Sequence, residues 1–379
     1  MDWALNDPDH GAYGSGQLRI GPHGDFVTSP SLGSDFSQLL AVQVGEWLMQ
    51  IDSSEGSENP LTLIDIGPGE GTLVADLIPA LFTRHPSLRK RLEVILVEKN
   101  LPMVERQKRT LDSLAPLKVQ WLSLDEIASQ PVMGVIIAHE VLDAMPVERL
   151  VLRKQNVYRQ GVALNHSDPG PYLIYEDLPI TSELTQSIQQ ARAHLGLIFP
   201  PKGAQDGWNT EWHVELKPWF QQSASALIKG KLLVIDYALE AARYYKSSRA
   251  NGTLMAYCNQ KASSDALSQP GLWDLTAHLC IETLIDQACT NGWRFLGEVR
   301  QGQALLALGL ARRINALQRM PPDQIQQAFK RREALLRLID PTCLGEFRWI
   351  AFERDQGRLN TDKTSFLEEP SDAKEQDKI

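Results

Sequence analysis

Three glycines at alternating positions are the strongest chemical signal in this sequence. Gly67, Gly69 and Gly71 follow the apolar run LTLIDI at 61–66 and precede a segment whose apolar residues have helical spacing. Glycine lets the backbone approach a ligand closely, and the N-terminus of a following helix offers unpaired N–H groups and partial positive charge. We therefore expect the loop to hold a nucleotide-like ligand; the alternative is a tight strand–helix turn that binds nothing.

The identity of that nucleotide depends on the loop's spacing and on two carboxylates beside it. The pattern G-x-G-x-G differs from the G-x-G-x-x-G of sites that bind a pyrophosphate, and Pro68 removes one N–H donor. Glu98 ends the apolar run at 92–98, where a carboxylate can accept hydrogen bonds from ribose hydroxyls. Asp65 precedes the first glycine, and its charge suits an amino group and a sulfonium cation but repels a pyrophosphate. These residues favour S-adenosylmethionine (SAM), with NAD as the alternative.

A second pair of carboxylates, Glu140 and Asp143 in AHEVLDAMP, comes at the end of a later apolar run, at 132–140. Methyl transfer from SAM requires donor and acceptor to be held in line, and a carboxylate can grip a guanidinium acceptor through two hydrogen bonds. A three-residue separation can place both side chains on one side of a turn. We predict that Glu140 and Asp143 are catalytic; the alternative is that one of them caps the following helix.

These residues need a sheet whose strands end at one edge. Runs rich in β-forming residues alternate with segments of helical spacing: strands are predicted at 61–66, 92–98, 118–122 and 132–140, and helices at 72–85 and 102–114. This alternation predicts an α/β fold with a parallel sheet and right-handed crossovers. In such sheets, ligands bind at the carboxyl ends of the strands, where the glycine loop, Glu98 and Glu140 would meet.

The later part of the chain predicts the rest of this organisation. A strand returns at 231–237, a helix follows at 275–292, and runs at 293–299 and 304–311 predict a terminal hairpin of the sheet. We expect four parts: an N-terminal segment that closes over the site, a core with two insertions that wall it, a helical extension and a disordered tail. Their predicted bounds are 1–60, 61–311 with insertions at about 151–226 and 238–275, 312–358 and 359–379.

The charge balance limits the classes of partner. The chain of 379 residues has a formal net charge of −9, whereas nucleic-acid-binding proteins usually show a basic balance or stripe. Its densest basic run, KRREALLRL at 330–338, has the spacing of an amphipathic helix, and we interpret it as a solvated helix face. We therefore expect no nucleic acid partner.

Cysteine spacing and the N-terminus predict the compartment. No C-x-x-C pair and no histidine at metal-ligand spacing accompanies Cys258, Cys280, Cys289 or Cys343, so we expect reduced thiols and no metal site. The N-terminus is acidic and polar, unlike a signal or transit peptide, and no apolar run is long enough to span a membrane. We predict a cytoplasmic protein.

Six motifs, taken together and in order, resemble the MidA family of class I SAM-dependent methyltransferases. They are GDFVTSPSLGSDF (24–36), IGPGEGTL (66–73), HEVLDAMPVERLV (139–151), VIDYA (234–238), GTLMAYCNQ (252–260) and PGLWDLTAHL (270–279). The resemblance runs from about residue 4 to 311. It implies a Rossmann-like sheet of about seven strands with helices on both faces, and SAM as cofactor. Thr28 and Ser29 of the first motif would reach SAM or cap a helix.

The resemblance also implies a substrate. Mitochondrial members of this family methylate an arginine of a respiratory complex I subunit during assembly. The resemblance therefore implies a protein arginine acceptor, carried by a subunit of a respiratory NADH dehydrogenase-type complex. Two alternatives stay open: a methyltransferase acting on a small molecule or another protein acceptor, and a non-catalytic, SAM-binding assembly factor. The presence of Glu140 and Asp143 favours catalysis. The sequence does not determine the oligomeric state.

Overall fold

A seven-stranded sheet forms the centre of the molecule. The computed structural model describes residues 1–22, 24–55, 60–168, 170–355 and 363–369. The strand order is β15-β16-β9-β4-β1-β2-β3, and neighbouring strands run parallel except for β16, which runs antiparallel between β15 and β9. The strands are β1 Leu61–Ile66, β2 Leu92–Val97, β3 Val119–Trp121, β4 Val132–His139, β9 Leu227–Asp236, β15 Arg294–Arg300 and β16 Arg348–Arg354. The predicted sheet of about seven strands is confirmed.

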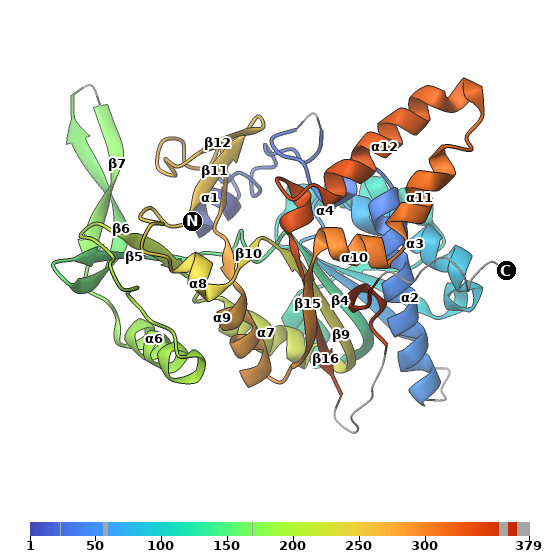
Figure 1. Cartoon of the computed structure of the whole chain (residues 1–379), viewed down its shortest axis with the longest axis horizontal. Helices are drawn as coiled ribbons and strands as arrows, with labels where there is room; N and C mark the ends of the chain where they lie inside the picture. Colours follow the sequence, from blue (N-terminus) through green and yellow to red (C-terminus); the bar gives the residue numbers. More distant parts are fainter. Residues whose placement is uncertain (23, 56–59, 169, 356–362, 370–379) are drawn as a thin grey trace.

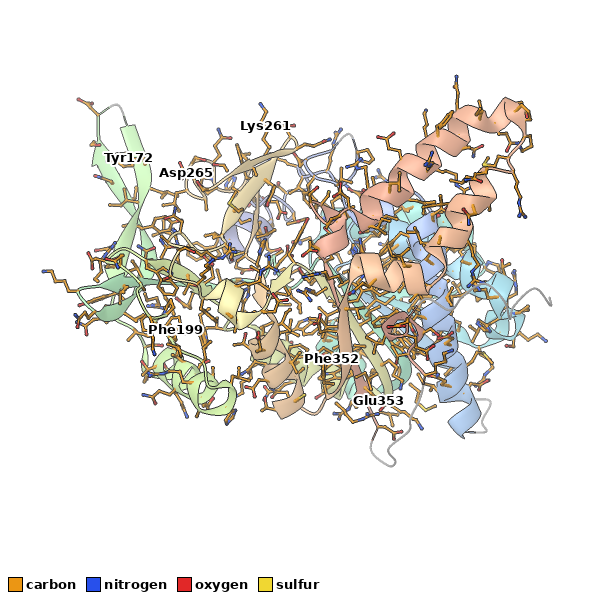
Figure 2. All side chains as sticks on the ribbon, in the orientation of Figure 1. Tyr172, Phe199, Lys261, Asp265, Phe352 and Glu353 are labelled. Carbon is orange, nitrogen blue, oxygen red and sulfur yellow. The ribbon has the colours of Figure 1, made fainter. Side chains whose placement is uncertain are left out.

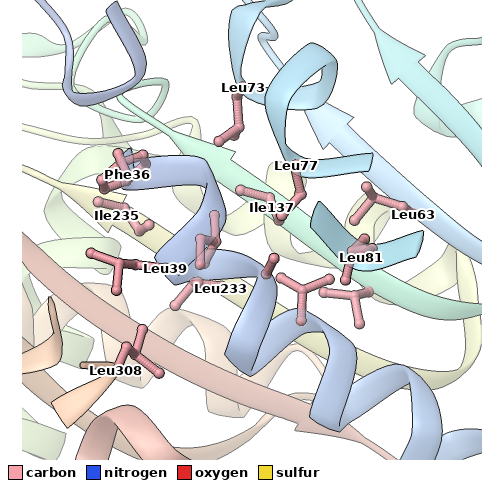
Figure 3. Close-up of a cluster of buried hydrophobic side chains, with 14 of the residues drawn as sticks. Phe36, Leu39, Leu63, Leu73, Leu77, Leu81, Ile137, Leu233, Ile235 and Leu308 are labelled. Carbon is pink, nitrogen blue, oxygen red and sulfur yellow. The ribbon is translucent and has the colours of Figure 1, made fainter. Parts of the chain in front are cut away.

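Helices cover both faces of this sheet (Figure 1). Successive side chains of a strand point to opposite faces, so Leu63 of β1 joins one core cluster and Ile64 joins the other. Figure 3 shows Leu81 of one helix beside Leu63 of the sheet, and Leu39 of a second helix beside Leu233 of the sheet. The helices on this face include α2 Asp35–Glu55, α3 Thr72–Arg84 and α10 Gln301–Ala307, and those on the other face include α5 Leu124–Ser129, α7 Leu216–Ser225 and α9 Ile281–Thr290. Helix α4, Leu101–Leu111, follows β2.

The chain between β4 and β9 builds a second sheet with its own core. Its order is β7-β6-β5-β8, and the β6–β7 hairpin, which carries Tyr172, projects from the body (Figures 1 and 2). Phe199 packs edge-on against Trp208, Trp212 and Tyr245 beneath this sheet. The elements are β5 Glu148–Arg153, β6 Asn156–Ser167, β7 Gly170–Leu178, α6 Ser182–Leu195 and β8 Asn209–Trp212. Helix α7, at the end of this stretch, returns to the main sheet.

A small third sheet joins the N-terminal segment to the rest. Its order is β12-β11-β13, and Leu5 and Leu18 pack against Ala256 and Leu275 of it. The elements here are α1 Asp2–Asn6, β10 Ala238–Leu239, α8 Ala241–Tyr244, β11 Met255–Cys258, β12 Lys261–Ser263, β13 Asp274–Thr276 and β14 Leu279–Cys280. Short 3-10 turns lie at Ser29–Leu32 (η1), Pro86–Lys90 (η2), Asp112–Leu114 (η3), Pro322–Gln324 (η4), Leu344–Glu346 (η5) and Ser365–Leu367 (η6).

The structure corrects the predicted end of the sheet. Residues 304–311 are not a strand: they lie in α10 and in the start of α11, Leu310–Leu317. Alanine and leucine are strong helix formers, and without β-branched residues this run prefers the helix. Among the described residues, the last strand is β16 instead. The expected helical extension at 312–358 therefore contains the long helix α12, Ile325–Ile339, followed by a strand of the core.

Two other boundaries also differ from expectation. The helix predicted at 275–292 begins only at Ile281, because residues 274–276 form β13, which pairs with β11, and residues 279–280 form β14, which pairs with β10. Within the predicted disordered tail, residues 363–369 are placed, with Phe366 buried against Trp47 and Trp349, while 359–362 and 370–379 lie outside the described residues. In the described part of the chain, no helix is long and apolar enough to cross a membrane.

Candidate active site

A cavity of about 440 Å³ lies where β1, β2 and β4 end, a volume typical of a small-molecule site. The predicted site residues that line it are Thr28, Asp65, Gly67, Pro68, Gly69, Glu98 and Glu140. Ser29, Gly71 and Asp143 do not line it. The structure thus brings seven of the ten candidates to one cavity, and the other three lie beside it in the chain.

The glycine loop has a backbone that other residues adopt only with strain. Gly69 has φ +53°, and a Cβ there would sit 3.0 Å from Cδ1 of Ile20. Gly71, with φ +80°, is the N-cap of α3 and leads the chain into that helix. The loop therefore keeps the space beside the N-terminus of α3 free of side chains, as the predicted cradle for a nucleotide requires.

Asp65 is a buried carboxyl whose Oδ2 lacks a hydrogen-bond partner among the described atoms. Burial raises the pKa of Asp65 to about 8, because an unpaired charge is costly away from water. A cationic amino group in the cavity would supply the missing partner. The orphaned oxygen therefore fits the amino group of SAM.

Glu98 is held in place by a buried glutamine. Its carboxylate accepts hydrogen bonds from the backbone N–H of Asn100 at 2.9 Å and from Nε2 of Gln107 at 3.0 Å. The same Nε2 donates to the carbonyl oxygen of Gly69 at 2.9 Å, and Nε1 of Trp121 donates to Oε1 of Gln107 at 2.9 Å. Carboxylate oxygens can accept more than one hydrogen bond, so Glu98 remains able to bind ribose hydroxyls.

Gln107 is a site residue that our sequence analysis missed. It lies between Met103 and Leu111 on the buried face of α4. A glutamine within such an apolar stripe is a signal that could have been used, because buried polar groups need hydrogen-bond partners. Its role is to fix Glu98 relative to the glycine loop.

The N-terminal segment forms the opposite wall of the cavity, with Ile20, Phe26 and Thr28 lining it. Arg106 of α4 fastens this segment to the glycine loop: its guanidinium donates to the carbonyl oxygens of Leu18, at 2.8 Å, and Gly16, and to Glu70 at 2.9 Å.

Thr28 and Ser29 stand at the start of η1. The backbone N–H of Thr28 donates to Oγ of Ser31 at 3.0 Å, and that hydroxyl donates back to the carbonyl oxygen of Thr28 at 2.7 Å. The hydroxyl of Ser29 is buried against the side-chain amide of Gln301, whose Nε2 lies 3.1 Å from it. Thr28 therefore both helps to cap η1 and lines the cavity, whereas the side chain of Ser29 points away from it.

Glu140 occupies a strained position at the edge of the cavity. Its φ of +54° lies in the left-handed region, which a non-glycine residue adopts only when its surroundings impose it. Its backbone N–H donates to the carbonyl oxygen of Ile235 at 2.9 Å, whereas Oε1 has no hydrogen-bond partner in the described structure. Burial, and then the charge of Asp236, raise the pKa of Glu140 well above its usual value; a backbone hydrogen bond from Ser29 opposes this. Such strain is frequent in functional sites.

Three further acids lie beyond Glu140. Asp236 holds the turn after β4: its carboxylate accepts hydrogen bonds from the backbone N–H groups of Val141 at 3.2 Å and Leu142 at 2.9 Å. Asp274 accepts one from the hydroxyl of Tyr13 at 3.0 Å. Burial raises the pKa of both carboxyls to about 7. Burial and neighbouring charges also raise the pKa of Asp143.

We call Glu140, Asp143, Asp236 and Asp274 the carboxyl cluster. Besides burial, Asp236 and Asp274 raise the pKa of Glu140 and of Asp143, and Glu140 also raises the pKa of Asp143, so a cation beside these buried acids is favoured. In the described residues, no group of three or more histidine, cysteine, aspartate or glutamate side chains has the arrangement of a metal site. Of the four acids, Glu140 lines the cofactor cavity, and the other three lie behind it.

His139 is buried and neutral. Burial lowers its pKa to about 3, and its ring lies 5.3 Å from that of Phe36 and 6.3 Å from that of Phe347. Its Nε2 is 3.4 Å from Oε1 of Glu140. The ring packs between the aromatic rings of Phe36 and Phe347, and its burial there favours the neutral form.

The strand order, the glycine loop and a carboxylate after the second strand define a class I SAM-dependent methyltransferase. The chain belongs to the family described as "Putative S-adenosyl-L-methionine-dependent methyltransferase", whose model matches residues 39–299.

Curated relatives and solved structures agree with this assignment. The human mitochondrial protein arginine methyltransferase NDUFAF7 is 26% identical, over 94% of this chain and 80% of its own length. Its Drosophila melanogaster homolog is 30% identical, over 93% and 79%. A Burkholderia thailandensis protein whose crystal structure contains S-adenosyl-homocysteine superposes with a TM-score of 0.77 at 29% identity, over 93% of this chain and 86% of that one. The predicted family, enzyme class and SAM cofactor are confirmed.

Proposed function

We propose that this methyltransferase transfers the methyl group of SAM to an arginine side chain of a protein. The observation that carries the proposal is the carboxyl cluster at the edge of the cofactor cavity, with an unpaired oxygen on Glu140. A guanidinium is a planar cation with several N–H donors, and it pairs with a carboxylate more specifically than other biological cations do. The curated relatives that are named protein arginine methyltransferases support the same acceptor.

In this proposal Glu140 holds the acceptor. Its carboxylate accepts hydrogen bonds from the guanidinium and leaves one nitrogen facing the cofactor cavity, in line for attack on the methyl group. SAM supplies the methyl group at a sulfonium centre. As the S–C bond of the sulfonium breaks and the new N–C bond forms, the methylated nitrogen must lose a proton, and the carboxylate of Glu140 can accept it. Burial disfavours the ionised carboxylates of the empty cluster, and a bound guanidinium cation stabilises them.

Methyl transfer can be followed with SAM labelled in its methyl group. The purified protein would be added to lysate from cells that lack it, and the labelled species identified by mass spectrometry. We expect label on an arginine of a protein. Label found only on a small molecule would refute the proposal, and so would transfer to no component of the lysate.

The variant Glu140→Gln tests whether the carboxylate of Glu140 holds the guanidinium of the acceptor; we call this role the clamp. The amide keeps the size of the side chain but cannot pair with a guanidinium as an anion does. We expect S-adenosyl-homocysteine to bind as in the wild type and transfer to fall about a hundredfold or more, as when a charge-stabilising group is removed from an active site. Glu183→Gln, which removes an exposed carboxylate from α6, is the matched control and should retain activity. Full turnover by Glu140→Gln would show that Glu140 is not a clamp.

Two finer points stay predictions. The family resemblance implies that the protein acceptor is a subunit of a respiratory NADH dehydrogenase-type complex, and the mass of the labelled species tests this directly. The second point is the cytoplasmic location, which stays a proposal. Fractionation of cells followed by immunodetection checks it, and recovery in another compartment would show the prediction to be wrong.

A further inference from the structure

Helices α11 and α12 form a hairpin that projects from the body of the molecule, at the upper right of Figure 1. One side of the hairpin is attached: Leu310, Leu317, Leu335 and Leu338 are buried in the core cluster. Polar contacts also hold it, because Arg313 and Arg331 each pair with Asp35 at 2.8 Å, at the start of α2. The hairpin is therefore fixed to the enzyme at its base.

A second apolar face of α12 is exposed to solvent. Ile325, Phe329 and Leu336 are 53%, 60% and 45% exposed. At 3.6 residues per turn these three side chains fall within an arc of about 40°, roughly a quarter turn or more from the buried Leu335 and Leu338. We call Ile325, Phe329 and Leu336 the outer stripe. A solvated helix face, as the sequence suggested, would not carry three large apolar side chains in line.

The hairpin is basic although the protein is acidic. Residues 310–339 contain seven lysines and arginines and two acidic residues, whereas the whole chain has a net charge of −9. Arg313 and Arg331 are used in the attachment to Asp35. The other five basic residues of the hairpin, all exposed or partly so, are Arg312, Arg319, Lys330, Arg332 and Arg337.

The cations and the outer stripe share one side of α12. On the helical projection, Arg332 flanks the stripe on one side, and Lys330 and Arg337 lie on the other, with the exposed Glu333 between them and the stripe. An exposed apolar stripe among lysines and arginines is the pattern of a helix that lies in a membrane interface. A nucleic acid backbone would match the cations but offers no apolar layer for the stripe.

We propose that the outer face of α12 binds the surface of an anionic lipid bilayer. The outer stripe enters the boundary between headgroups and acyl chains, and Lys330, Arg332 and Arg337 contact lipid phosphates. Both interactions are needed, because three apolar side chains alone would give only weak partitioning. This binding is peripheral and involves no spanning helix. It is independent of the methyl acceptor, so either proposal can fail without the other.

Flotation of the full chain with lipid vesicles tests the proposal. One set of vesicles contains equal parts of phosphatidylglycerol and phosphatidylcholine, and the other contains phosphatidylcholine alone. We expect the protein to float with the anionic vesicles only, and binding to weaken as salt is raised, because salt screens the contacts with phosphates. Absence of flotation, or equal flotation with both kinds of vesicle, would overturn the proposal.

Variants separate the two interactions. Each basic residue near an anionic surface changes partitioning about fivefold, so Lys330→Glu/Arg332→Glu should weaken vesicle binding by more than tenfold. Phe329→Ser should weaken it as well. Lys217→Glu/Lys261→Glu, the matched control, makes the same charge change on exposed residues elsewhere and should bind nearly as the wild type does. Binding of S-adenosyl-homocysteine by every variant shows that each is folded.

Other occupants of this face would give different results. If the wild type ignored vesicles but bound poly-glutamate, and Lys330→Glu/Arg332→Glu abolished this, the face would serve an acidic protein. If the wild type sedimented as a dimer that Phe329→Ser dissociated, it would be an interface between copies of this chain. Unchanged vesicle binding by both α12 variants would place the lipid contact elsewhere. Each of these outcomes overturns the membrane proposal.

Discussion

Asp65 should make cofactor binding depend on pH. In the structure its carboxyl is buried, has an unpaired oxygen in the cofactor cavity and has a pKa of about 8. Near neutral pH the empty site therefore holds Asp65 largely protonated. A ligand whose amino group pairs with the carboxylate requires the ionised form, so binding must release this proton.

The size of the effect follows from the pKa. With a pKa of about 8, about one molecule in eleven carries the ionised carboxylate at pH 7. Binding at pH 7 should then release about 0.9 proton from Asp65. The ionised fraction rises about ninefold from pH 6 to pH 7, so affinity should rise by the same factor, or about 1.3 kcal/mol.

Calorimetry with S-adenosyl-homocysteine measures both quantities. Titrations at pH 7 in two buffers with different heats of ionisation give the number of protons released, and a pH series gives the affinities. Asp65→Asn cannot ionise, so it should bind more weakly and release almost no proton. Asp274→Asn is the matched control: it removes a carboxyl with a pKa of about 7 that does not line the cavity, and proton release should persist.

Two results would refute the reasoning. The first is binding by the wild type without proton release and with no change of affinity between pH 6 and pH 7. The second is equal proton release by the wild type and Asp65→Asn, which would assign the proton to another group. Either result would mean that Asp65 does not pair with the amino group of the ligand.

Other parts of the site give further expectations. Glu98→Ala should weaken S-adenosyl-homocysteine binding by about 1–3 kcal/mol in the same calorimetric assay, the usual cost of losing a hydrogen bond to a charged group; unchanged affinity would exclude a ribose contact. Gly69→Val should abolish binding, because a branched residue at φ +53° is strained and its Cβ would meet Ile20; wild-type affinity would contradict this. Burial raises the pKa of Asp65 from about 4 in the unfolded chain to about 8 in the folded protein, so the wild type loses stability as pH rises through that window. Asparagine cannot ionise, so the melting temperature of Asp65→Asn relative to that of the wild type should rise from pH 4 to pH 8. A fall of this difference would contradict the raised pKa. Hydrogen exchange at 24–30 should slow when S-adenosyl-homocysteine binds, whereas protection confined to the glycine loop would exclude the N-terminal segment from the site.

Local patterns predicted much of the parallel half of the sheet. The apolar run at 61–66 lies between Pro60 and Gly67, and β1 has those bounds. The glycine loop and Glu98 could be placed because they follow strands directly, and strand ends of a parallel sheet meet at one edge. These features depend on neighbours in sequence, so the sequence reveals them.

Long-range pairing was not visible in the same way. The choice between 304–311 and 348–354 as the last strand depends on which segment fits between β9 and β15, and both runs contain enough apolar residues. The same limit applies to the site. Asp236 holds a turn that lies more than ninety residues earlier in the chain, and Arg106 fastens Gly16 and Leu18, so no local pattern marks either role.

Glu140 and Asp143 show both sides of this limit. The sequence predicted correctly that they lie close to the end of β4, because three residues cannot separate far. It did not predict that the turn between them would be held by Asp236, with Glu140 at φ +54° on the cavity and Asp143 buried behind it. A one-dimensional pattern gives proximity, but the direction of each side chain depends on the backbone conformation.

The internal position of β16 has a consequence for how the protein is made. The strand that fills the gap between β9 and β15 is synthesised after both of them, and Arg348 pairs in register with Asp236. Until β16 emerges from the ribosome, two strand edges stay unpaired, which invites association with other nascent chains. The strand that ends at Asp236 also lacks one neighbour until then. A chain that lacks β16 leaves the sheet open between β9 and β15, at the strand whose Asp236 holds the turn beside the cavity.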